Sequence, residues 1–233
     1  MTQSPIVIDY YSDILCVWAY IAQVRVDEIQ QAFGEKVVFK HHFFSLFGDT
    51  ETRLGVGWKD KGGFDGFHDH VDAVCLQHPH VQLHPDVWKP GCQPASSATP
   101  HLMIQAIQVL ANKGALDNPR EVYQKTLVEQ VICAIRRAFF EQGRNIGDMA
   151  VLWDILGDFG IDRAEVQQVL DDGSALALHS HQNEKRYTLQ LEGSPTYILD
   201  GGRQKLFGNV GYRVIQANIE QLLKDKSTEM SWC

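Results

Sequence analysis

The sequence lacks the features that would direct it to a membrane, to secretion or to nucleic acid. No apolar run approaches the roughly 18–20 residues of a membrane-spanning helix. The opening residues, MTQSPIVIDYYSD, have no basic segment ahead of a long apolar one, as a secretory signal would. The formal net charge of −8 comes without a long basic stripe, which disfavours a general nucleic-acid binder. We therefore expect a cytoplasmic protein with neither membrane nor nucleic acid as its partner.

The sequence also lacks cysteines at C-x-x-C spacing. The five cysteines stand at positions 16, 75, 92, 133 and 233, and no two of them have C-x-x-C spacing. This pattern disfavours a structural disulfide framework and fits a reducing compartment. Three H-x-H pairs begin at His68, His78 and His179, but no H-E-x-x-H or other metal-ligand spacing accompanies them. We expect solvated loop histidines and no metal.

What is present is a β-α-β pattern at the start of the chain and a β-β-α pattern at its end. A β-type run at Ile6–Tyr11 precedes a helical pattern over residues 16–33, and residues 35–46 are again strand-like. Near the other end, two short strands at 196–200 and 203–207 flank an Asp-Gly-Gly hairpin signal. A final helix follows, for which Asn209 is the candidate cap.

The residues between these halves divide into two parts. Residues 47–95 are rich in Gly, Pro, His and Asp and predict long loops, with a short helix near 64–77 and a role as a cover for the site. Residues 96–185 show helical periodicity throughout, with Leu127, Val131, Ile135 and Phe139 on one face of a long amphipathic segment. The sequence thus predicts an α/β thioredoxin fold, formed by 1–46 and 186–233, with a loop-plus-helical insertion at 47–185.

Three motifs resemble one branch of that fold, the DsbA-like proteins. SDILCVWAY (12–20) is similar to the S-D-x-x-C-P-W-C-Y of cytosolic members of the FrnE type. RRAFFEQGRNIGD (136–148) resembles their insertion helix, and GSPTYIL (193–199) resembles their proline loop. The layout also resembles 2-hydroxychromene-2-carboxylate isomerases and kappa-class glutathione transferases, which carry a serine at the nucleophile position and activate bound glutathione.

The resemblance implies the roles of individual residues. Cys16 becomes the catalytic nucleophile, and Pro195 becomes a cis proline that faces it. The implied substrate-binding residues are Ser194, Pro195, Thr196, Trp18 and Asn209, the last near a helix start that favours anions. The start of a helix lowers the pKa of a thiol, whereas a nearby Asp13 carboxylate raises it. The alternative for Cys16 is a purely structural role, as a small buried side chain in the core.

Two departures from the motif limit the chemistry. Ala19 replaces the second cysteine and Val17 the proline of C-P-W-C, so Cys16 has no resolving partner at the usual place. An external thiol must then complete any disulfide exchange, and glutathione is the expected co-substrate. Cys75 or Cys92 could instead approach Cys16. In addition, FGNVGYR stands where kappa-class relatives have a Ser-Asp pair for glutathione.

The sequence therefore predicts a thiol-disulfide oxidoreductase or isomerase with one active-site cysteine, no tightly bound cofactor and a small-molecule thiol or a peptide or protein disulfide as substrate. A glutathione-dependent isomerase or transferase is the first alternative. The second alternative is a non-catalytic peptide-binding module, because a thioredoxin fold without its second cysteine can still bind an extended peptide. Whether the chain is a monomer or a homodimer stays open.

Overall fold

The computed structural model describes residues 4–117 and 125–224, and Cys233 lies outside them. A four-stranded sheet forms its centre, in the order β2-β1-β3-β4. Strands β1 (Ile6–Ser12) and β2 (Val37–Phe43) run parallel, while β3 (Thr196–Leu199) pairs antiparallel with both β1 and β4 (Gln204–Phe207). The parallel pair and the terminal hairpin are those that the sequence predicts.

The connection from β1 to β2 is helical but not continuous. The segment expected as one helix forms α1 (Val17–Ile21) and α2 (Gln23–Phe33), which join at Ala22. A right-handed crossover of this kind is what lets two strands pair in parallel. The last helix, α9 (Tyr212–Lys224), buries Ile215, Ile219 and Leu222 on one face, and it packs with α2 against the sheet.

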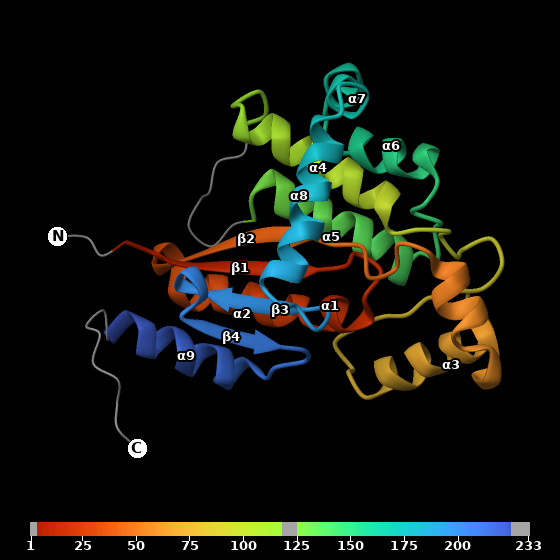
Figure 1. The fold of residues 1–233 in the computed structure, drawn as a ribbon, viewed down its shortest axis with the longest axis horizontal. Coiled ribbons are helices and arrows are strands. Elements are labelled where there is room, and N and C mark those ends of the chain that lie inside the picture. Colours follow the sequence, from red (N-terminus) through yellow and green to blue (C-terminus); the bar gives the residue numbers. More distant parts are fainter. Residues whose placement is uncertain (1–3, 118–124, 225–233) are drawn as a thin grey trace.

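Five helices fill the predicted helical insertion and gather on the β2 side of the sheet (Figure 1). They are α4 (Ala98–Asn112), α5 (Leu127–Phe140), α6 (Met149–Gly157), α7 (Arg163–Asp171) and α8 (Ser174–Thr188). Helix α5 begins with a capping box between Thr126 and Glu129, and it buries much of the face that the periodicity indicates. The predicted domain boundary at 185/186 falls inside α8, and the division into two domains itself stays a prediction.

The segment 47–95 is more regular than the sequence predicts. It contains a π-helical turn at Glu51–Val56, a 3₁₀ turn at Lys59–Lys61 and the helix α3 (Gly63–Leu76) near the expected place. The residues after α3 run along α1 and α2, where the Tyr20 hydroxyl bonds the Gln82 carbonyl and the His80 ring donates to the Ile21 carbonyl. The core explains the regularity, because α3 buries Phe67, Val71 and Val74 in the cluster that also contains residues of α1.

Within the described residues, no helix combines the length and the apolar character needed to cross a membrane.

Candidate functional site

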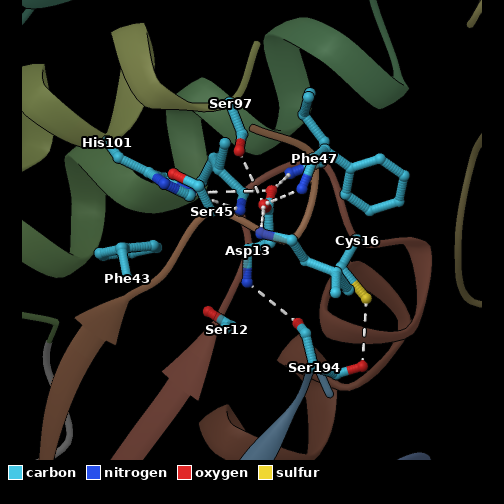
Figure 2. Close-up of polar contacts among 12 residues, drawn as sticks. Ser12, Asp13, Cys16, Phe43, Ser45, Phe47, Ser97, His101 and Ser194 are labelled. Carbon is cyan, nitrogen blue, oxygen red and sulfur yellow. Dashed lines mark hydrogen bonds and ion pairs between the residues drawn. The ribbon is translucent and has the colours of Figure 1, made fainter. Parts of the chain in front are cut away.

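Cys16 lies at the junction of β1 and α1, and the fold brings it against the proline loop. It occupies the N-cap position of α1 in an extended conformation, and its carbonyl accepts bonds from the Ala19 and Tyr20 amides. The Cys16 thiol donates to the Ser194 carbonyl, with 3.2 Å between Sγ and the oxygen. The Ser194–Pro195 peptide bond is cis. Residues 16 and 194 thus meet although 178 positions separate them (Figure 2).

The surroundings of the thiol favour its neutral form. Cys16 is only 4% exposed, and this burial raises the pKa of the thiol. Interactions with the Ser194 side chain and with the backbone of Ala19 and Trp18 lower the pKa, while the charge of Asp13 raises it further. The net shift is upward, because the amides at the helix start lower the pKa as the sequence indicates but by less than burial raises it. The five-residue helix α1 does not outweigh the loss of solvation.

Asp13 joins four parts of the chain. Its side chain is fully buried and accepts four hydrogen bonds, from the backbone amides of Leu15, Leu46 and Phe47 and from the Ser97 hydroxyl. Its own amide donates to the Ser194 hydroxyl over 3.0 Å. Figure 2 shows the resulting cluster between the end of β1, the segment after β2, the start of α4 and the proline loop.

The carboxylate of Asp13 affects the ionisation of the Cys16 thiol. Burial raises the pKa of Asp13, and its four donors hold it down in part. The charge of the carboxylate disfavours ionisation of Cys16, while the backbone amide of the same residue holds the Ser194 hydroxyl of the proline loop. The sequence predicted the first effect but not the second.

His101, on α4, is a member of the same cluster that sequence reasoning missed. Its Nε2 accepts a bond from the Ile14 amide over 3.0 Å, so the neutral ring carries its proton on Nδ1. Complete burial holds the pKa of His101 well below its ordinary value. It therefore fixes the backbone between Asp13 and Cys16 as a neutral imidazole. No spacing in the sequence links residue 101 to residue 14, so no signal could have found it.

The other predicted site residues have mixed positions. Ala19 is fully buried at the place of a resolving cysteine, and Trp18 is half-buried with its ring edge against His78. Thr196 is fully buried, and its hydroxyl donates to the Gly193 carbonyl, so its side chain supports the proline loop from within.

Asn209 does not head the last helix as predicted. It lies three residues before the first residue of α9. Its side-chain oxygen accepts a 2.6 Å bond from Arg25 of α2. The capping prediction is therefore wrong, because the turn at Gly208–Gly211 separates Asn209 from the helix and leaves the Gly211 carbonyl to accept the bond from the Val214 amide.

Within the described residues, Cys75, Cys92 and Cys133 are free and form no bond with Cys16. Residues 4–117 and 125–224 contain no group of three His, Cys, Asp or Glu side chains that could hold a metal ion. The local chemistry of the site is that of one thiol beside one proline loop.

Comparison with known proteins agrees with this geometry. The family model of the DSBA-like thioredoxin domain matches residues 121–220. No curated protein matched the sequence.

Three solved structures illustrate the likeness. The probable DsbA oxidoreductase of Streptomyces coelicolor is 19% identical, with a TM-score of 0.69 over 98% of this chain and 94% of that one. The cytosolic disulfide reductase DsbM of Pseudomonas aeruginosa, in a structure with GSH, is 19% identical, with a TM-score of 0.62 over 94% and 99% of the two chains. A 2-hydroxychromene-2-carboxylate isomerase is 13% identical, with a TM-score of 0.62 over 94% and 96%.

The resemblance to the DsbA-like group is thereby confirmed, and the chain has a DsbA-like thioredoxin fold with a helical insertion. At these identities the structural neighbours show the fold alone.

Proposed function

We propose that the chain is a thiol-disulfide oxidoreductase that works through Cys16 alone and uses glutathione to complete its cycle. The contact between the Cys16 sulfur and the Ser194 carbonyl carries this proposal. It sets the one thiol at the start of α1 directly against the loop that would dock a substrate.

The reaction has two exchange steps. The Cys16 thiol first loses its proton to solvent, and the thiolate attacks the glutathione sulfur of a mixed disulfide. A bond forms between Cys16 and glutathione, and the substrate leaves as a thiolate that takes up a proton. A second glutathione thiolate then attacks the Cys16–glutathione disulfide, which releases oxidised glutathione and returns the Cys16 thiolate. Over the two steps, the substrate thiol is reduced and one reduced glutathione is consumed, because the glutathione that leaves the substrate and the attacking glutathione depart together as one oxidised glutathione.

The Ser194 carbonyl gives this cycle a docking step. In the free protein that carbonyl accepts the Cys16 thiol proton. Once the sulfur is in a disulfide it has no proton to donate, so the carbonyl becomes free to accept a backbone amide of the bound thiol compound. Ser194 thus exchanges one donor for another as the mixed disulfide forms. Its position is held by the bond from the Asp13 amide to its hydroxyl.

The raised pKa of Cys16 favours one alternative function. A neutral buried thiol donates a hydrogen bond, as a serine hydroxyl does. The site could then bind glutathione as a thiolate that accepts this bond and attacks a small electrophile, which is isomerase or transferase chemistry. In that case Cys16 would form no covalent bond.

Substitutions of Cys16 distinguish the functions. We would measure glutathione-coupled reduction of a mixed disulfide and conjugation of glutathione to a small aromatic electrophile, in Cys16→Ser and Cys16→Ala. The matched control is Cys92→Ser, which changes a partly exposed thiol away from the site. The proposal requires that both Cys16 variants lose disulfide reduction while the control keeps it.

Other outcomes have defined meanings. If Cys16→Ser keeps conjugation and only Cys16→Ala loses it, the isomerase or transferase function is correct. If all variants lack both activities but bind an extended peptide as the wild type does, the chain is a binding module. The proposed chemistry needs reduced glutathione, so it places the protein in a reducing compartment such as the cytoplasm.

A further inference from the structure

A cavity lies beside α1, between α2 and α5, and none of its lining residues bonds the Cys16 sulfur. It has a volume of about 300 Å³, which lies at the small end of the range for ligand pockets. Its walls come from α1, α2, α5 and the residues that flank α5, and from Phe159, two residues after α6. The lining residues are Tyr20, Gln23, Asp27, Lys125, Gln130, Cys133, Arg136, Arg137, Glu141 and Phe159.

The walls of this cavity carry more positive than negative charge. Three cationic side chains line it, Lys125, Arg136 and Arg137, against two carboxylates, Asp27 and Glu141. The Asp27 charge is already matched, because Lys125 lies 2.8 Å from it. Glu141 accepts a bond from the Tyr20 hydroxyl. The lining therefore has a surplus of one positive charge.

The Arg136 guanidinium is buried in the cavity wall without a carboxylate partner in the described part of the chain, and this costs free energy. It is 1% exposed, and its two terminal nitrogens donate only to neutral groups, the Gln23 amide oxygen and the Ser12 hydroxyl. Its Nε has no partner, and within the described residues no carboxylate lies at ion-pair distance from Arg136 or Arg137. A buried guanidinium without a counter-charge is unfavourable, and an anion in the adjoining cavity would offset that cost.

We propose that this cavity binds a small organic monocarboxylate. One negative charge matches the surplus of one positive charge, and a guanidinium has the fork geometry that a carboxylate accepts. The amides of Gln23 and Gln130 add polar contacts, while the Tyr20 and Phe159 rings suit an apolar body. This site uses none of the residues that contact the Cys16 sulfur, so it does not depend on the proposed function.

Cys133 provides a reporter for the test. Its side chain is partly exposed in the cavity wall, so a bound ligand would shield it from alkylation. We would follow iodoacetamide labelling of Cys133 by peptide mass analysis, with benzoate as the carboxylate probe. Benzamide serves as the neutral probe of the same shape, and inorganic phosphate as the rival anion. The matched variants are Arg137→Gln in the cavity wall and Arg213→Gln on the exposed surface of α9.

The proposal predicts that benzoate slows labelling of Cys133 with a saturable dependence and that benzamide does not. Arg137→Gln should raise the half-saturating benzoate concentration about tenfold, as expected for loss of one charged hydrogen bond, and Arg213→Gln should leave it unchanged. Arg137 is exposed, so its removal leaves the core intact. Equal protection by benzamide, stronger protection by phosphate, no protection at all, or the same result in both variants would each refute the carboxylate site.

Discussion

Asp13→Asn tests whether hydrogen bonds or burial of charge dominate at the centre of the site. The substitution keeps the shape of the side chain. If the amide oxygen replaces Oδ1, it still accepts from the Leu15 amide, but the new NH₂ group then faces the Leu46 and Phe47 amides, which donate to Oδ2 in the wild type. The buried Phe47 amide is thus left without an acceptor, whereas the Leu46 amide keeps its bond to the Phe44 carbonyl and the Ser97 hydroxyl can turn to accept from the new amide.

The size of the effect follows from these contacts. An unsatisfied buried donor costs about 1–3 kcal/mol, so the free energy of unfolding should fall by about 1–3 kcal/mol. That is a measurable part of the ~5–15 kcal/mol that stabilises a typical domain. Urea unfolding followed by tryptophan fluorescence measures it. The control is Ser97→Ala, which removes one of the four donors and should cost about 1 kcal/mol.

The result that would refute this reasoning is equally specific. If Asp13→Asn is as stable as the wild type, or more stable, then the cost of burying the carboxylate exceeds the gain from its four hydrogen bonds. The same variant removes the charge that raises the pKa of Cys16, so the pH midpoint of Cys16 alkylation should move down. An unchanged midpoint would show that the Asp13 charge does not act on the thiol.

Three further predictions concern single side chains. Alkylation of Cys16 in the wild type should have its pH midpoint above that of a free cysteine, because burial raises the thiol pKa, and a lower midpoint in a labelling series would contradict this. Burial acts to raise the pKa of Glu129, but bonds from His41, Thr126 and Gln30 outweigh it and hold the pKa at about 2, below the ordinary value of 4.5. The ionised Glu129 carboxylate therefore stabilises the fold above pH 4.5, and this stabilisation is lost as the pH falls through about 2. As the pH is lowered over that range, the difference in free energy of unfolding between the wild type and Glu129→Gln should shrink by about 3 kcal/mol. A difference that does not change with pH would refute the shift. Ala19→Cys places a thiol one helical turn after Cys16, so oxidised glutathione should convert the two thiols to an intramolecular disulfide without bound glutathione in peptide mass analysis, whereas Ala22→Cys should form only mixed disulfides with glutathione.

Much of the fold could be predicted because its signals are local. The alternation at Ile6–Tyr11, the Asp-Gly-Gly turn and the periodicity of residues 96–185 each reflect neighbours in the chain. Where the prediction failed, a distant contact decided the structure. In the segment 47–95 the helix expected near 64–77 forms as α3, but the turns at Glu51–Val56 and Lys59–Lys61 were not expected, and Leu54 of the first is buried in the distant core. Asn209 does not cap the last helix because α9 begins three residues later, at Tyr212, and its side chain instead bonds Arg25 of α2.

The sequence by itself determined that a β-α-β pattern opens the fold and a β-β-α pattern closes it. It also determined that one thiol lies at a helix start and that no second thiol follows three residues later. These depend on residue type and spacing, which a chain carries before it folds. Only the tertiary structure decided that the thiol is buried against Ser194, that Asp13 and His101 fix the backbone beside it, and that Arg136 stands without a counter-charge in a cavity wall. The physical reason is that solvation and hydrogen-bond partners are set by residues tens to hundreds of positions away, and no local pattern records them.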